Sequence, residues 1–261
     1  MSSGPPIVLA FAASDPTGGA GVQADVLTLA AMGCHPLSVV TALTVQDTSG
    51  VHDVRVVDAA LVRAQAERLL AETRVAAFKL GVLASKANTD AVADILARYP
   101  DVPVVVDPVL ASGRGDPLAG DEAIGALVER VLPQATVATP NGVEARRLTG
   151  EESLARCAEK MSDMGCEYVL ITGGHEGGDE VVNTLYAGGA VVREDRWPRL
   201  PGSYHGSGCT LASALAAALA SGRQVPEAAR DAGEYAWQAL KSSFASGLGQ
   251  RIPDRFFWAD R

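Results

Sequence analysis

The chain has 261 residues, of which 48% are hydrophobic and only 5% are aromatic. This length fits one large α/β domain or two small ones, and it allows a sizeable core without disulfides or a structural metal. The formal net charge is −9 and the sequence contains no run of Lys and Arg. Both features disfavour DNA, RNA and acidic membrane surfaces as partners. An anionic ligand would therefore be held by local groups such as backbone amides or a metal ion.

The strands and helices are predicted from short apolar runs that alternate with longer amphipathic segments. In chain order we predict strand 7–13, helix 22–32, strand 37–43, helix 61–73, strand 76–83, helix 89–99, strand 102–106, helix 121–131, strand 136–138, helix 154–164 and strand 168–172. A β-hairpin follows at 181–186 and 191–197, and helices at 210–220 and 226–244 complete the chain. The repeated β-α-β pattern predicts a mainly parallel central sheet with helices on both faces. No stretch resembles a linker, so we predict one domain over residues 1–261.

Cysteine usage and the N-terminus indicate the compartment. The four cysteines form no Cys-x-x-Cys pair and the four histidines are scattered, which disfavours a zinc site. The N-terminus lacks a charged region followed by an apolar stretch and a cleavage site, and no apolar run reaches membrane-spanning length. We expect a cytoplasmic protein with free thiols and no membrane association.

The first glycine segment, 14–21, directly follows the first predicted strand. Within it, residues 19–24 match the dinucleotide fingerprint G-x-G-x-x-[G/A], but the next strand runs into Gln46 where an acidic residue is expected. A nicotinamide cofactor is therefore disfavoured. A tight turn alone would also use glycine. The segment has more glycines than a turn requires, so we predict a substrate loop that includes Asp15 and Gly19.

The second glycine segment, Gly206-Ser207-Gly208-Cys209, precedes an Ala-rich helix. Consecutive backbone N–H groups at such a helix start bind anions without Lys or Arg. The segment is no Walker A loop, because no Gly-Lys-Ser/Thr follows at the required spacing. Cys209 lies near the helix N-terminus, a position that lowers a thiol pKa and favours the thiolate. The alternative is a small buried cysteine in a packed helix.

Polar residues follow several other predicted strands, where open parallel sheets bind ligands. Asp107 and Glu144 could hold Mg²⁺ beside phosphates. The alternative for Asn141 and Glu144 is a helix cap and its capping-box partner. The strand at 168–172 runs into Gly173-Gly174, which suits the close approach of a nucleotide.

Taken together, these segments resemble the ribokinase-like superfamily, and more closely its hydroxymethylpyrimidine/phosphomethylpyrimidine kinases of thiamine biosynthesis. The matching segments extend over almost the whole chain, at 14–25, 40–46, 79–83, 106–110, 139–145, 173–175 and 205–211. The resemblance implies a three-layer α/β/α fold with a small β-hairpin. It also implies ATP- and Mg²⁺-dependent phosphorylation of 4-amino-5-hydroxymethyl-2-methylpyrimidine and of its monophosphate, by a protein whose relatives are often homodimers.

The resemblance also implies roles for particular residues. Gln46 would hydrogen-bond the aminopyrimidine edge, in a ring pocket lined by Ala20, Val82 and Val109. The remaining roles are contacts along the nucleotide from Asn141, Thr172, Gly173 and Gly174, the Mg²⁺ site at Asp107 and Glu144, and an anion hole formed by the amides from Gly206 to Cys209. Most sugar kinases of the superfamily have an Asp base at the position of Cys209, so we predict that the Cys209 thiolate accepts the substrate's hydroxyl proton.

Some positions depart from the family pattern, and alternatives stay open. Lys is frequent in the family at the position of Thr172, and its absence here removes a positive charge near the nucleotide. A pyridoxal or pyridoxine kinase of the same superfamily would use the same chemistry on a related ring. A non-catalytic pyrimidine-binding protein could keep the same fold without the reaction.

Overall fold

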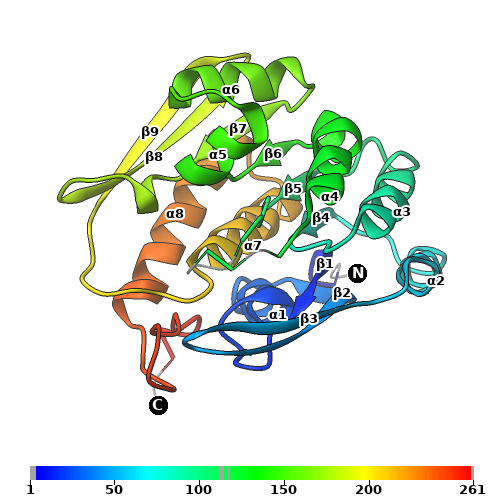
Figure 1. The fold of residues 1–261 in the computed structure, drawn as a ribbon, viewed down its shortest axis with the longest axis horizontal. Coiled ribbons are helices and arrows are strands. Elements are labelled where there is room, and N and C mark those ends of the chain that lie inside the picture. The colour runs from blue at the N-terminus through cyan, green and yellow to red at the C-terminus, as the bar shows by residue number, and fades with distance from the viewer. Residues whose placement is uncertain (1–3, 112–114, 117, 260–261) are drawn as a thin grey trace.

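The computed structural model describes residues 4–111, 115–116 and 118–259. Its centre is a nine-stranded sheet in the order β3-β2-β1-β4-β5-β6-β7-β8-β9 (Figure 1). The pairings from β2 through β1, β4, β5 and β6 to β7 are parallel, and those of β3, β8 and β9 are antiparallel. The strands span Ile7–Ser14 (β1), His35–Asp47 (β2), Gly50–Val56 (β3), Ala77–Leu80 (β4), Val104–Val106 (β5), Val137–Ala138 (β6), Tyr168–Ile171 (β7), Glu180–Ala187 (β8) and Ala190–Pro198 (β9).

Helices cover both faces of this sheet. One face carries α1 (Gly21–Ala31), α7 (Ser207–Ala220) and α8 (Val225–Lys241). The other carries α2 (Ala59–Leu70), α3 (Lys86–Leu96), α4 (Asp121–Ala126) with a π-helical turn at Leu127–Val131, α5 (Gly142–Thr149) and α6 (Leu154–Asp163). The predicted three layers, parallel sheet and β-hairpin are therefore confirmed.

The two cores follow from the alternation of side chains along buried strands. Val8 and Val105 pack against α1, α7 and α8, whereas Leu9, Phe11 and Val106 pack under α2 to α6. All five side chains are fully buried. Each stabilises the fold by about 1.5–3 kcal/mol relative to an exposed side chain. Strands buried on both faces explain why apolar runs, without polar alternation, marked them in the sequence.

The sequence prediction missed β3, which pairs antiparallel with β2. Its residues His52, Asp53 and Arg55 are polar, and the strand lies at an edge of the sheet, so no apolar run marks it. The pairing is irregular between Val45 and Gln46, where a β-bulge lies. Bulges re-aim side chains at the rims of sheets, and Gln46 faces the cavity described below.

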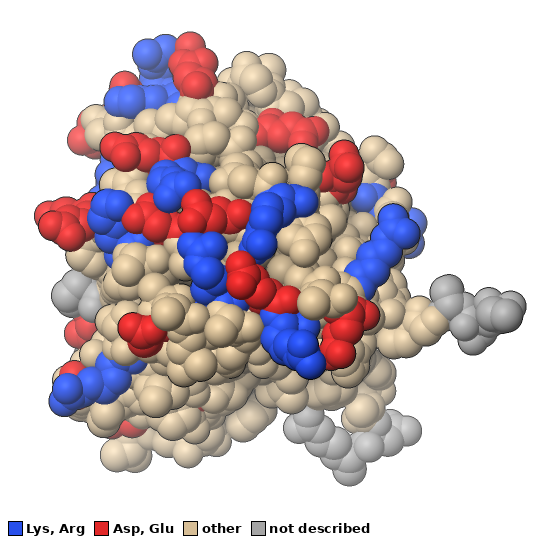
Figure 2. Space-filling view, turned by 90° about the vertical axis from the view of Figure 1, so that its right-hand side faces the viewer, with Lys and Arg blue, Asp and Glu red and all other residues tan. Residues whose placement is uncertain are grey.

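Charges of both signs are interspersed on the face that carries α2 and α3 (Figure 2). There, Arg130 bridges Asp90 and Asp94, and Arg63 also pairs with Asp94. Such exposed pairs contribute little stability, roughly 0–1 kcal/mol each. Among the described residues, no helix is long and apolar enough to cross a membrane.

Candidate active site

A cavity of about 530 Å³ opens at the carboxyl ends of the central strands. Strand β1 pairs with β2 on one side and β4 on the other, so the winding of the chain reverses there. Ligands bind at such switch points in open α/β sheets. The predicted residues that line this cavity are Asp15, Ala20, Gln46, Val82, Asp107, Val109, Asn141, Glu144, Thr172, Gly174, Gly206, Ser207, Gly208 and Cys209.

Gly19 and Gly173, also predicted as site residues, lie outside the cavity lining. A side chain at Gly19 would collide with the His205 ring, and one at Gly173 with the backbone of Val182. Both glycines permit close packing behind the cavity wall. Both glycines therefore support the loops and do not form the cavity surface.

The two glycine segments are in direct contact at one end of the cavity. Gly206 has a φ of +78°, and a Cβ atom there would collide with the carbonyl oxygen of Gly19. Helix α7 begins immediately afterwards at Ser207, and no described side chain caps it. The first N–H groups of a helix have no intrahelical acceptor and lie at its positive end. The cavity wall at Ser207, Gly208 and Cys209 is consequently a place where an anion can bind.

Asp15 organises the first glycine segment. Its carboxylate accepts hydrogen bonds from the Thr17 N–H, the Thr17 hydroxyl and the Ala20 N–H, and lies 2.9 Å from Nε2 of His205. Burial raises the pKa of Asp15, but His205 and the backbone donors outweigh it and lower that pKa to about 2. The carboxylate is thus ionised and occupied, so Asp15 shapes the loop more than it offers a free acceptor.

A buried ion cluster lies beneath the cavity. Nζ of Lys79 is 2.8 Å from Oδ1 of Asp25 and 3.5 Å from Oδ2 of Asp107, and all three side chains are at most 5% exposed. Asp25 also accepts a hydrogen bond from Ser213 on α7. Burial alone would lower the pKa of Lys79, but the charges of Asp25 and Asp107 raise it, so the side chain is an ammonium.

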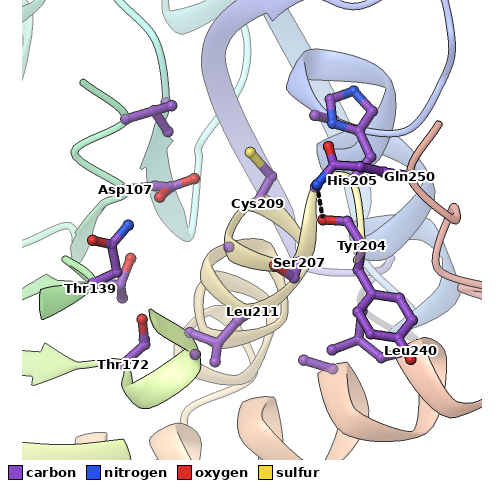
Figure 3. A pocket seen from close by; sticks show the side chains of 18 of the residues that line it. Asp107, Thr139, Thr172, Tyr204, His205, Ser207, Cys209, Leu211, Leu240 and Gln250 are labelled. Carbon is purple, nitrogen blue, oxygen red and sulfur yellow. Dashed lines mark hydrogen bonds between the residues drawn. The ribbon is translucent and has the colours of Figure 1, made fainter. Parts of the chain in front are cut away.

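Cys209 does not have the lowered pKa that its helix position predicts. Burial, followed by the charge of Asp107, raises the pKa of the Cys209 thiol, and these effects outweigh Lys79 and the N–H of Gly21. The thiol therefore carries its proton in the free protein. Figure 3 shows Cys209 and Asp107 on opposite elements, facing one another across the cavity. The thiolate prediction is wrong for the free protein because desolvation outweighs the helix terminus.

Asp107 and Glu144 form an acidic pair beside this thiol. Burial and the charge of Asp107 raise the pKa of Glu144 to about 8, and burial raises that of Asp107 as well. The capping alternative is confirmed: Asn141 accepts from the N–H of Glu144, and Glu144 from the N–H of Asn141. Oδ2 of Asp107 accepts no hydrogen bond from any described residue. Asp107 and Glu144 are a candidate site for a divalent cation, because its charge would relieve the repulsion between the two carboxylates.

The other end of the cavity combines the Thr172–Gly174 turn with aromatic side chains. Arg199 donates hydrogen bonds to the carbonyl oxygens of Gly173 and Gly174, and to three further backbone carbonyls of the same loop. A positive charge thus lies beside the turn although Thr172 itself is uncharged. Trp197, Trp237 and Leu240 also line the cavity.

Comparison with known proteins decides the family. A family model for phosphomethylpyrimidine kinase matches residues 15–253. A protein of Streptomyces coelicolor named hydroxymethylpyrimidine/phosphomethylpyrimidine kinase is 43% identical over 251 residues, which cover 94% of this chain and 92% of the relative. The chain belongs to the phosphomethylpyrimidine kinase family. It is therefore a phosphotransferase, as the glycine segments and their resemblance predict.

Two solved structures confirm the ribokinase-like fold of this kinase. The phosphomethylpyrimidine kinase of Clostridium difficile matches with a TM-score of 0.78 and 32% identity, over 90% of this chain and 99% of that one. The pyridoxal kinase of Staphylococcus aureus, in complex with AMP-PCP and pyridoxal, matches with a TM-score of 0.88 and 28% identity, over 98% and 95%.

Sequence reasoning assigned no role to several charged groups of this kinase. Lys79 was visible as a single Lys inside an otherwise apolar predicted strand, which was a usable signal for a buried ion pair. Asp25 and Arg199 gave no comparable signal, because their partners are distant in sequence.

The raised pKa of Glu144 predicts a pH-dependent stability in metal-free kinase. The folded protein keeps this proton up to about pH 8, whereas the unfolded chain releases it near its ordinary pKa of about 4.3. Stability should therefore fall as pH rises between these values. Urea unfolding at several pH values should show a smaller fall for Glu144→Gln. The exposed Glu122→Gln, as a control, should keep the wild-type slope, and an unchanged slope in Glu144→Gln would contradict the burial of this charge.

Proposed function

We propose that this kinase phosphorylates 4-amino-5-hydroxymethyl-2-methylpyrimidine, and then its monophosphate, with ATP as donor, for thiamine biosynthesis. One observation carries the proposal: Cys209 and the N-terminus of α7 lie in the same cavity as the Gln46, Val82 and Val109 side chains. A ring acceptor in that pocket can place its hydroxymethyl oxygen beside Cys209. The α7 amides are then available to the transferred phosphoryl group.

The nucleotide would extend from α7 toward Asn141 and the Thr172–Gly174 turn. Mg²⁺, held by Asp107 and Glu144, would supply positive charge that neutralises the phosphates. The amides of Ser207, Gly208 and Cys209 would hydrogen-bond the charge that develops on the transferred group. Backbone donors suit a chain of net charge −9, which brings few free cations to the site.

The proton path needs the Cys209 thiol to lose its own proton, because the thiol is neutral in the free protein. The charge of Asp107 raises the pKa of this thiol and the charge of Lys79 lowers it, so these two groups set how readily the proton leaves to solvent. Cys209 would then take the proton of the substrate hydroxymethyl group as this oxygen attacks the γ-phosphate. Lys79, next to Asp107, stabilises negative charge on either group.

A pyridoxal kinase is the second candidate. The observation that favours it is the close structural match to the Staphylococcus aureus enzyme, whose complex holds pyridoxal. Both acceptors are six-membered nitrogen rings that carry a hydroxymethyl group.

The test is to incubate the protein with ATP, Mg²⁺ and each acceptor separately, and to measure products by mass spectrometry. We expect pyrimidine mono- and diphosphate. Faster phosphorylation of pyridoxal would replace the proposal, and pyrimidine binding without product would indicate a non-catalytic protein.

We further propose a single cytoplasmic domain that assembles as a homodimer. One continuous sheet through the chain supports the single domain. Leu43 and Val45 lie on the same face of β2 and are 53% and 56% exposed, which supports an apolar contact with a second copy. Light scattering should give twice the mass of one chain. Replacing both residues with Ser should shift the protein toward monomer, and a wild-type monomer would exclude the dimer.

The proposed base predicts the effect of Cys209→Ala. General bases contribute about 10²–10⁴-fold, so turnover should fall by roughly a hundredfold or more. Cys34→Ala, at another buried cysteine that lies outside the cavity lining, serves as the control and should keep its turnover. Unchanged turnover in Cys209→Ala would remove the base role and leave the kinase assignment intact.

The proposed acceptor contact predicts the effect of Gln46→Ala. The variant loses the side chain that would read the aminopyrimidine edge but no group on the nucleotide side. Calorimetry should show pyrimidine binding weakened by about tenfold, the loss expected for one hydrogen bond left unmade. ATP binding should be unaffected. Equal losses for both ligands would argue against this contact.

A further inference from the structure

A buried arginine near the C-terminus has no role in the function proposed above. Arg255 is 3% exposed and lies 14 residues after Lys241, the last residue of α8. Its guanidinium donates from Nη1 to the Gly18 carbonyl (3.3 Å), from Nη2 to the Gly19 carbonyl (2.5 Å) and from Nε to the Thr210 hydroxyl (3.2 Å). One side chain therefore contacts the first glycine segment and Thr210, which directly follows the second segment almost two hundred residues later in the sequence.

The C-terminal segment is fixed well enough to hold this side chain in place. The hydroxyl of Tyr235 on α8 donates to the Arg255 carbonyl. The rings of Phe257 and Trp258 pack against Tyr235, with centroids 5.7 and 6.1 Å away. In Figure 1 this segment, in red, lies at the end of α8 beside the β2–β3 hairpin, and the N–H of Gln250 donates to a carbonyl there. The apolar tail thus anchors Arg255.

Arg255 fixes two peptide planes of the substrate loop. In a trans peptide the carbonyl and the following N–H point in opposite directions. Arg255 binds the carbonyls of Gly18 and Gly19, while on the opposite side the Gly19 N–H donates to Thr17 and the Ala20 N–H donates to Asp15. Both planes are therefore held at both ends. A glycine-rich loop has little stiffness of its own, so these contacts determine its shape.

The same guanidinium reaches the start of α7 through Thr210. The Thr210 hydroxyl accepts from Arg255 and donates to the Gly206 carbonyl, 2.8 Å away. That carbonyl belongs to the peptide unit whose N–H is that of Ser207, the first amide of the proposed anion hole. Because the Gly206 carbonyl points toward Thr210, the Ser207 N–H of the same peptide plane points away from Thr210.

We propose that Arg255 is a positioning residue that sets the distance and orientation between the substrate loop and the anion hole. This inference rests on the proposed function, because it assigns the acceptor to one loop and the phosphoryl group to the other. Arg255 touches neither in this arrangement, and it acts through Gly18, Gly19 and Thr210. Its loss would leave each half of the site able to bind but would misalign the two halves.

The test compares Arg255→Met with Arg251→Met. Arg251 is in the same C-terminal segment, but its side chain bonds only Ser243 among the described residues. We expect Arg255→Met to lower kcat by about a hundredfold, the cost of roughly 1 Å of misplacement, with KM for ATP changed less than kcat. Hydrogen exchange at 18–20 and 206–210 should become faster in Arg255→Met and stay unchanged in Arg251→Met.

Other outcomes separate the possible failures. Equal kcat in the two variants, or a loss confined to KM, would overturn the positioning role. If Arg255→Met does not fold, Arg255→Lys carries the test: it keeps the charge but not the planar fork, so wild-type kcat in that variant would overturn the proposal. A wild-type protein that phosphorylates neither acceptor would refute the proposed function instead, and exchange at the two loops would still report on Arg255.

Discussion

The contact of Lys79 with Asp25 and Asp107 is the interaction on which the rest of the site depends. It joins α1, β4 and the end of β5, and the hydrogen bond from Ser213 to Asp25 adds α7. Unpaired charges cannot be left in a protein interior without a cost of several kcal/mol, so these elements are constrained to meet at one point. This meeting point is the floor of the cavity. It brings Asp107 next to Cys209 and places the start of α7 above the sheet.

A second constraint follows from the acidity of the chain. With a net charge of −9 and Lys79 and Arg255 already committed to internal partners, the anion-binding end of the cavity is built from peptide groups. Peptide donors must be aimed in advance, which requires glycine segments for close approach and fixed partners to hold them. Three side chains supply those partners. Asp15 accepts from the N–H of Ala20 and lies 2.9 Å from Nε2 of His205, and the Thr210 hydroxyl donates to the Gly206 carbonyl. The buried charges of Asp15 and Arg255 therefore hold the loops rather than the ligand.

The architecture and the cavity lining could largely be predicted from the sequence, because both leave local patterns. Buried parallel strands leave apolar runs, and a helix start that binds anions leaves a glycine segment. The edge strand β3 leaves no such pattern, since it is polar and paired on one side only. The protonation of Cys209 could not be predicted either. A helix N-terminus lowers a thiol pKa in general, but here burial and Asp107, which is distant in sequence, raise it. Arg255 was hidden for the same reason, because its partners at Gly18 and Thr210 become neighbours only in the fold.

The central claim is that the acceptor hydroxymethyl group and the γ-phosphate meet between Cys209 and the first amides of α7. The most direct measurement is a crystal structure with the hydroxymethylpyrimidine, a non-hydrolysable ATP analogue and Mg²⁺ bound together. The account predicts γ-phosphate oxygens within about 3 Å of the amides of Ser207 to Cys209, the usual length of such hydrogen bonds. It also predicts the acceptor oxygen beside Sγ of Cys209 and the ring against Gln46. A γ-phosphate bound away from α7, or an acceptor oxygen remote from Cys209, would contradict it.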